Sequence, residues 1–416
     1  MPRRLTADLD VSGSTRPLVL IVITCLAAII SMVSFAIWPV FLVTLGGEWN
    51  LSNVEIGWVG GAYFIGYVVA TPVLVGLTDS IDAKRIFIGG SLATATGSAG
   101  FALFADGFWS AALAWSIVGT GLAGTYMPGL QILNARLSDD RRIRAVPFYT
   151  SCFSLGTGVS FLVNGTLLAY VDHKVAAWVG AGGAFAAAMA VLVLVRSRAP
   201  QRRPASEARH PLDLRPAIRN RVAFSYILAY GAHTYELFAF RGWSFALFAL
   251  IGARHGLSLG LVTGLVSALT LAGMAASIIG ARLCLGNGRH RIISFVGMAS
   301  VIVAAVSSLV LGAPVWIALG CLFIYNACIM LDSGALTAGV VSVAGEGDRG
   351  ALLAVHSMVG FAGGSLGAPA VGMMLDLGGG GDRLDAWSGA LLVMGLGSAL
   401  VALIQWRAWR RHGFAV

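Results

Sequence analysis

The sequence predicts an all-α integral membrane protein with twelve transmembrane helices, built as two six-helix bundles that an internal repeat relates. Three observations predict this fold class. The chain of 416 residues is 57% hydrophobic and only 11% charged, whereas soluble domains are about 25% charged. Its apolar residues gather in runs that are long enough to cross a bilayer, which takes roughly 20 residues per helix. The two halves of the chain also resemble each other.

The apolar runs define the expected helices in order. They lie near residues 18–44, 54–77, 86–105, 109–134, 146–171, 175–195, 222–251, 257–281, 292–311, 314–338, 351–376 and 386–406. Span 2 opens with Ser52-x-x-Glu55, the pattern of a helix capping box. We therefore interpret Glu55 as a helix cap and not as an acid of a cavity.

The basic residues predict the orientation of these spans. Most of the 28 Lys and Arg residues lie at the two chain ends or in loops that follow even-numbered spans, while Lys174, Arg254 and Arg383 lie in the opposite loops. Because cytoplasmic loops are rich in Lys and Arg, both termini are expected in the cytoplasm. We expect a multi-pass protein of a bacterial-type inner (plasma) membrane. The arginines are dispersed in short clusters, which argues against nucleic-acid binding.

A polar segment divides the chain. Residues 196–221 contain eight arginines and four prolines without apolar periodicity, which is typical of a linker. The predicted organisation is an N-terminal six-helix bundle (1–195), a cytoplasmic linker (196–221) and a C-terminal six-helix bundle (222–416).

The two bundles are related by an internal repeat. Several short stretches align at one common offset: Leu51-Ser52 with Leu257-Ser258, Ser151 with Ser357 and Gly158 with Gly364, while Trp38 aligns with Trp243 one residue away. A duplicated six-helix unit predicts a central site between two similar bundles, which is the layout of secondary transporters.

Span 7 carries three ionisable residues, His233, Glu236 and Arg241. Each costs about 2.5–3.5 kcal/mol at bilayer depth, so such residues face a cavity, pair with one another or handle an ion or a substrate. On a helical wheel, Tyr226 and Tyr230 fall on the same side as His233 and Arg241, with Glu236 to one side. A structural Glu236–Arg241 pair is the alternative, but a spacing of five residues places the two on different faces.

Other spans supply further candidates. Asp332 in span 10 is a second intramembrane acid, and His356 at the start of span 11 is either a cavity residue or part of a wet helix end. Arg241 is expected to bind an anionic group, and His233 to relay a proton. The predicted substrate-binding residues are Arg241, Tyr230, Tyr226, His233, Trp38, Tyr126, Tyr149 and Asn326. The predicted proton-coupling residues are Glu236, Asp332 and His233.

The loop between spans 2 and 3 carries a family resemblance. It reads Val75-Gly76-Leu77-Thr78-Asp79-Ser80-Ile81-Asp82-Ala83-Lys84-Arg85 and resembles the G-x-L-x-D-R-x-G-R-K pattern of the major facilitator superfamily. Leu77, Asp79 and Lys84 match in register, whereas Asp82 stands where the second Gly belongs. The resemblance covers essentially the whole chain. It implies a cytoplasmic gate, formed here by Asp79, Lys84, Arg85 and Arg144, that joins the bundles when the cavity opens outward.

Two departures from the family refine the prediction. In span 4, Trp115 stands where the family's R-x-x-x-G-x-G segment has its arginine, which shifts the expected proton coupling to span 7 and Asp332. Span 5 has the glycines of the drug/proton antiporter pattern but lacks its proline, which argues against drug efflux.

No motif for enzymatic chemistry is present, since G-x-S-x-G, P-loop and H-E-x-x-H patterns are missing. We expect a transporter that is not an enzyme and needs neither a cofactor nor a metal. The predicted function is that of a secondary transporter, a symporter that moves a small solute such as an organic anion by alternating access with a coupling proton. Its expected partners are that solute, the proton and the lipid bilayer, and we expect a monomer. The alternatives are proton-antiport efflux of amphipathic drugs or metabolites, and a receptor or scaffold of the same fold that does not transport.

Overall fold

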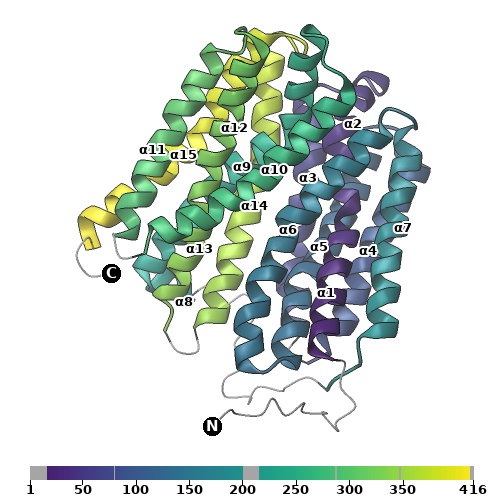
Figure 1. The fold of residues 1–416 in the computed structure, drawn as a ribbon, viewed down its shortest axis with the longest axis vertical. Coiled ribbons are helices and arrows are strands. Elements are labelled where there is room, and N and C mark those ends of the chain that lie inside the picture. Colours follow the sequence, from purple (N-terminus) through teal and green to yellow (C-terminus); the bar gives the residue numbers. More distant parts are fainter. Residues whose placement is uncertain (1–15, 79, 200–214, 286–287, 346–347, 413–416) are drawn as a thin grey trace, which may run out of the picture.

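A computed structural model describes residues 16–78, 80–199, 215–285, 288–345 and 348–412. They form two groups of helices that lie side by side (Figure 1). The first group is α1 (Pro17–Ser31), η1 (Met32–Ala36), α2 (Ile37–Glu48), α3 (Asn53–Leu77), α4 (Ala83–Phe104), α5 (Phe108–Arg136), α6 (Asp139–Leu167) and α7 (His173–Leu194). The second is α8 (Arg215–Arg219), α9 (Arg221–Arg254), α10 (Leu259–Leu283), α11 (Arg289–Leu309), α12 (Val315–Leu331), α13 (Ser333–Ser342), α14 (Arg349–Leu377) and α15 (Leu384–His412).

The helices follow the expected spans closely. Among the described residues, 11 helical segments are long and apolar enough to cross a membrane, and each coincides with one expected span. The remaining expected span, the fourth, corresponds to the 29-residue helix α5, in which glycine, serine and threonine recur among the apolar residues. The all-α fold class predicted from hydropathy agrees with this arrangement.

Two spans that hydropathy predicts as continuous helices are broken. In the first span, the 3₁₀ segment η1 separates α1 from α2, and in the tenth, Asp332 separates α12 from α13. At the first break, the carbonyl oxygen of Val33 accepts hydrogen bonds from Ser160 Oγ (2.7 Å) and Asn164 Nδ2 (2.8 Å) of α6. The break therefore persists because side chains satisfy the backbone groups that it exposes, as the bilayer requires.

The capping box predicted at the start of α3 is confirmed. Ser52 Oγ accepts a hydrogen bond from the Glu55 backbone N–H, and the Glu55 carboxylate accepts one from the Ser52 N–H at 2.8 Å. In the second half, Ser258 caps α10 in the same way by accepting from the Leu261 N–H. Glu55 is thus a helix cap, and the repeat preserves the serine cap.

Helices α3 and α14 join the two halves along their length. We call the end of the molecule with the α3–α4 and α5–α6 loops the basic end, and the opposite end, where α3 begins, the far end. Near the far end, a Cβ added to Gly57 would lie 2.4 Å from the carbonyl oxygen of Ala368. One added to Gly372 would lie 2.0 Å from the carbonyl oxygen of Asn53. The two backbones touch there, and only glycine permits that approach.

A carboxylate reinforces this contact between the halves. Asp376, in the last turn of α14, accepts hydrogen bonds from the backbone N–H groups of Asn53 and Val54, each at 2.9 Å, and from Asn53 Nδ2 at 2.8 Å. It therefore caps α3 from the other half, where the positive end of the helix dipole attracts a negative charge. The far end is closed.

Candidate functional site

A small pocket lies between the two halves beside Arg241. Its volume is about 30 Å³, which holds water but no organic solute. The first half contributes Phe35, Trp38, Pro39, Leu42, Ile56, Gly60, Tyr63, Phe64 and Trp115 to its wall, and the second half contributes Phe238, Arg241, Gly242, Trp243 and Ala368. The wall is aromatic and aliphatic apart from a single charge, Arg241.

The Arg241 side chain is exposed by only 4%, and its Nη2 makes no hydrogen bond to the protein. It forms no ion pair with any residue that the structure describes. A buried charge without a partner is strongly unfavourable. A guanidinium offers a planar fork of donors that matches a carboxylate or phosphate, and here Nη2 is a donor without a partner inside an apolar wall.

Two tryptophans that the repeat relates hold the pocket in shape. Trp38 Nε1 donates to the carbonyl oxygen of Ile56 in α3, and Trp243 Nε1 donates to that of Ala368 in α14, both at 3.0 Å. Each indole is held by this hydrogen bond and by an edge-on ring contact, Trp38 with Phe101 and Trp243 with Trp387. Trp115 also lines the pocket at 2% exposure, so a neutral ring occupies the place of the family's span-4 arginine.

A buried acid–imidazole pair lies in the second half. His233 Nδ1 is 2.6 Å from Asp332 Oδ1, and the two side chains are 1% and 3% exposed. Asp332 occupies the break between α12 and α13, and broken helices commonly form ion and substrate sites in transporters. His233 Nε2 has no hydrogen-bond partner. The pair therefore combines one carboxylate with one free basic nitrogen.

Glu236 lies away from the central pocket, inside the second half. Its Oε1 accepts hydrogen bonds from Tyr325 Oη at 2.7 Å and from Ser300 Oγ at 3.3 Å. A Cβ added to Gly397 of α15 would lie 2.6 Å from the Glu236 Cβ. The carboxyl group thus faces α11, α12 and α15, which is the direction that its offset on the helical wheel allowed.

A much larger cavity of about 840 Å³ opens at the basic end. Its wall includes the loop after α3, the second half of α5, the start of α6, the start of the linker, α13 and the start of α14. Tyr126 and Tyr149 lie in this wall, together with Arg136, Arg142 and Arg198. Tyr149 Oη donates to the carbonyl oxygen of Thr125 at 3.0 Å. The cavity has the size of a ligand site.

Four phenylalanines separate the cavity from the pocket. We call Phe64 and Phe153 of the first half and Phe238 and Phe361 of the second half the aromatic layer. The ring centroids of Phe64 and Phe238 are 4.1 Å apart, and Phe361 lies 5.8 Å from Phe64 and 5.7 Å from Phe238. Phe153 is 6.5 Å from Phe238. No residue lines both spaces, so the pocket and the cavity are distinct.

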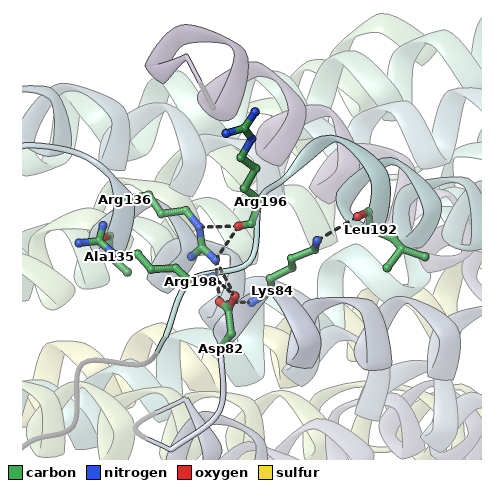
Figure 2. Close-up of polar contacts among 7 residues, drawn as sticks. All are labelled: Asp82, Lys84, Ala135, Arg136, Leu192, Arg196 and Arg198. Atoms are coloured by element: carbon green, nitrogen blue, oxygen red, sulfur yellow. Dashed lines mark hydrogen bonds and ion pairs between the residues drawn. The ribbon is translucent and has the colours of Figure 1, made fainter. Parts of the chain in front are cut away.

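A polar network surrounds Asp82 at the basic end (Figure 2). Arg136 Nη2 donates to Asp82 Oδ1 at 2.7 Å, the Arg198 N–H donates to Oδ2 at 2.7 Å, and the Lys84 N–H donates to Oδ1 at 3.1 Å. Burial acts to raise the pKa of Asp82, but these hydrogen bonds and the Arg136 charge outweigh it, so the pKa is lowered. The guanidinium of Arg198 also donates to the carbonyl oxygen of Ala135.

The predicted gate residues form no contact between the halves in this network. Lys84 Nζ donates to the carbonyl oxygen of Leu192 at 2.9 Å, within the first half, and Arg85 and Arg144 are exposed. Asp79 lies outside the described residues. The residue that organises the loop is Asp82, which the family pattern did not suggest, although an acid just before a helix start is itself a capping signal.

The predicted substrate residues separate into distinct places. Trp38 and Arg241 line the pocket, and Tyr126 and Tyr149 line the cavity. The other four lie within the second half: Tyr226 stacks on His290 at 4.4 Å, Tyr230 on His356 at 3.8 Å, Asn326 Nδ2 donates to the Leu269 carbonyl oxygen at 2.8 Å, and His233 pairs with Asp332. The aromatic layer and Asp376 were missed, because single phenylalanines and a span-end aspartate carry no distinguishing pattern.

Two repeated helix bundles with a small pocket between them and a larger cavity at one end are the layout of secondary transporters. The model of the Major Facilitator Superfamily matches residues 23–368. The chain therefore belongs to this superfamily, and it is a multi-pass membrane transporter and not an enzyme. The expected twelve-helix fold is confirmed.

Solved structures with this fold are similar over nearly the whole chain. One is a bacterial homolog of the human lysosomal transporter Spinster in an inward-facing, unoccupied conformation, with a TM-score of 0.71, 15% identity, and 95% of this chain and 96% of that chain covered. A D-xylose-proton symporter gives a TM-score of 0.74 at 14% identity, with 94% and 97% covered. The nucleoside transporter NupG gives 0.68 at 16% identity, with 93% and 99% covered.

One curated relative matches part of the chain. It is the "Probable sphingolipid transporter spinster homolog 2" of Arabidopsis thaliana, 24% identical over 132 residues. The match spans 32% of this chain and 27% of the relative.

Proposed function

We propose that this protein is a secondary active transporter that moves a small organic anion by alternating access, coupled to protons. The observation that carries the proposal is the buried Arg241 guanidinium, which lines the central pocket with Nη2 unpartnered. An anion that enters the pocket supplies the missing hydrogen bonds and the missing charge. Charge-assisted bidentate hydrogen bonds of this kind are among the strongest in proteins.

The wall around Arg241 restricts the rest of the substrate. Trp38, Trp115 and Trp243 surround the charge, and the wall contains no acidic side chain. An apolar or aromatic body packs well against such rings, whereas a polyol would leave its hydroxyl groups without partners. The favoured substrate is a monoanion with a compact apolar body, such as an aromatic carboxylate.

The conformation supports alternating access between the two ends. The far end is closed by the α3–α14 contact and by Asp376, while the 840 Å³ cavity opens at the basic end. The positive-inside pattern of the loops supports a cytoplasmic location for both termini, and in that orientation this cavity faces the cytoplasm. Opening the far end and closing the basic end then exposes Arg241 to the other side.

The coupling proton is assigned to the His233–Asp332 pair, which is buried and lies at a helix break. Intramembrane ionisable groups of this kind are typical of proton pathways. Glu236 lies on the same helix as His233, about one turn further along α9, and is a second candidate for carrying the proton.

A second candidate function is proton-coupled efflux of amphipathic compounds. The size of the basic-end cavity favours it, since 840 Å³ accommodates a solute with a longer apolar chain. The sphingolipid transporter named for the Arabidopsis relative is consistent with this class.

The test compares matched charged and neutral probes. Purified protein is screened by thermal shift with benzoate against benzamide, and with octanoate against octanamide. A carboxylate is expected to stabilise the wild type more than its amide does, and Arg241→Gln is expected to remove that difference. Arg254→Gln is the matched control, because Arg254 ends the same helix in the exposed region.

Counterflow in proteoliposomes then measures exchange of the carboxylate that binds best. Loss of exchange in Arg241→Gln but not in Arg254→Gln supports the proposal. Equal stabilisation by the acids and their amides, or an Arg241→Gln variant that still responds, contradicts it. A preference for octanoate over benzoate favours the amphipathic class.

A further inference from the structure

A line of polar side chains begins at the 840 Å³ cavity and leads into the second half. Thr337 of α13 lines the 840 Å³ cavity, and its Oγ1 is 3.1 Å from Nε2 of His356 in α14. Thr337 Oγ1 also lies 3.3 Å from the carbonyl oxygen of Ser333. Its hydroxyl hydrogen can therefore rotate between two acceptors. This places a half-buried hydroxyl between the water of the cavity and an imidazole that is only 4% exposed.

One ring of α9, Tyr230, contacts both that imidazole and the buried pair. The Tyr230 ring centroid lies 3.8 Å from that of His356 and 5.6 Å from that of His233, and both contacts are stacked. The two histidines on either side of this contact each keep one buried nitrogen without a hydrogen-bond partner, Nδ1 of His356 and Nε2 of His233. A neutral imidazole with one engaged and one free nitrogen can accept a proton at one and release it from the other.

Few other titratable groups face this line of side chains. Its own helix α9 contributes Tyr230 and Glu236, α3 contributes Tyr67, and α12 contributes Tyr325 next to Glu236. Cys284 at the end of α10 faces Asp332, and Arg241 interacts with Tyr230. Asp332 is thus the acid that meets a histidine directly, and the two histidines are the groups that lead to it from the cavity.

We propose that Thr337 and His356 form the proton entrance that connects the basic-end cavity with the His233–Asp332 pair. The inference rests on the proposed proton coupling and deepens it. Cavity water delivers a proton over the Thr337 hydroxyl to His356. The His356 ring takes up one proton at Nε2 and releases the one on Nδ1 to a water molecule beside Tyr230, which passes a proton to Nε2 of His233. The His233 ring then becomes an imidazolium beside the Asp332 carboxylate. His356 returns to its neutral form.

This route is separate from the anion site. Thr337 lines the cavity, whereas Arg241 lies behind the aromatic layer in a pocket that shares no residue with the cavity. In this conformation, a proton therefore exchanges with the basic end while the anion site is shut. Proton release and anion release at the same end need not occur in one step.

The first test needs no substrate. Exchange of the histidine C2 hydrogen with deuterated water requires a protonated ring that water reaches, and mass spectrometry measures it for each histidine. Thr337→Val, which keeps the shape but removes the hydroxyl, is expected to slow exchange at His356, because the rate follows the fraction of protonated ring and its contact with water, and the hydroxyl is the group that links the ring to the cavity. Thr337→Ser, which keeps the hydroxyl, should preserve it. His173 and His290 are internal controls, because neither touches this line of side chains.

An unchanged rate at His356 in Thr337→Val overturns the entrance, and so does an equal slowing at His290, since that outcome reports a general structural change.

The second test separates the entrance from the transport function. In proteoliposomes with benzoate or octanoate, Thr337→Val and His356→Gln are expected to lower pH-gradient-driven accumulation by about tenfold more than they lower counterflow. Thr337→Ser should recover accumulation. Equal losses of both activities contradict the entrance, as does accumulation at the wild-type level. If the wild type exchanges neither anion, the proposed function fails, and the histidine exchange experiment alone decides the entrance.

Discussion

The two ends of this transporter satisfy their polar groups in opposite ways. At the far end, Asp376 of the second half caps α3 of the first half, and Gly57 and Gly372 bring the backbones of α3 and α14 into contact. At the basic end, Asp82 is bound by Arg136 and Arg198, all within the first half and its linker. One end is held by bonds between the halves and the other by bonds inside one half.

The difference shows how a cavity opens without exposing unsatisfied groups. An acid that loses its partners when two bundles separate leaves buried donors unpaired, which costs about 1–3 kcal/mol for each group. At the basic end, that cost does not arise, because the Asp82 network remains complete while the cavity is open. The far end gains its stability from contacts that disappear when it opens. Variants at matched positions test this difference between the far end and the basic end.

The largest expected effect comes from a glycine contact inside the first half. A Cβ added to Gly119 would lie 1.7 Å from the carbonyl oxygen of Tyr63, and both residues belong to one bundle. Gly119→Val is expected to lower the free energy of unfolding by about 3 kcal/mol, since no relative movement of the halves relieves the overlap. Thermal unfolding in detergent measures the loss. If Gly119→Val were as stable as the wild type, the first bundle would accommodate the added side chain. The expected difference from Gly57, which lies between the halves, would then be contradicted.

Asp82→Asn is expected to cost about 2 kcal/mol at neutral pH, because it removes a buried charge-assisted network. The folded protein lowers the pKa of Asp82, so this stabilisation is present above the ordinary Asp pKa of about 3.9 and is lost as the pH falls through the lower folded value. Unfolding curves of the two proteins should therefore converge in acid. A difference that does not shrink as the pH falls below the ordinary Asp pKa of about 3.9 would contradict an ionised Asp82 as its cause.

Gly57→Ala affects the interface between the halves. The added Cβ would overlap the Ala368 carbonyl oxygen, but here separation of α3 from α14 relieves the contact. We expect a shift of about 1–2 kcal/mol toward a conformation with the far end open, and a smaller loss of unfolding free energy than in Gly119→Val. Electron–electron resonance between spin labels at the exposed positions Phe104 and Leu309 measures the distance across the far end. An unchanged distance distribution would contradict this role.

The smallest effect is expected for Asp376→Asn, which weakens the cap on α3 without adding bulk. A shift of about 1 kcal/mol toward the open far end follows from loss of the charge at the helix terminus. The same spin-label pair measures it. Asp385→Asn is the control, because Asp385 is exposed and lies at the same end. Equal shifts in the two variants would show that the effect comes from removing any negative charge at this end, and not from loss of the cap on α3.

Hydropathy and capping patterns were sufficient for the architecture. The expected spans and the Ser52–Glu55 box follow from the sequence because each depends on residues near one another in the chain. The helix breaks at Val33 and Asp332 were not predictable, because the groups that stabilise the first break, Ser160 and Asn164, come from another helix.

The candidate site shows the same limit. The helical wheel indicated that Glu236 points elsewhere than Arg241, and the structure places its carboxyl group against Tyr325 and Ser300. The helical wheel could not give the position of each residue along the axis of the molecule. Arg241 and Tyr126 were expected at one site, yet they line two separate spaces, because the rings that part them come from four helices of both halves.

The aromatic layer has a consequence for the speed of the transport cycle. Phe64 and Phe153 move with one half, and Phe238 and Phe361 move with the other, so any rocking of the halves separates ring pairs that are each worth about 0.5–1.5 kcal/mol. These contacts add to the activation barrier and not to the affinity for the solute. Turnover should therefore respond steeply to temperature and to the size of these four side chains, even where binding does not.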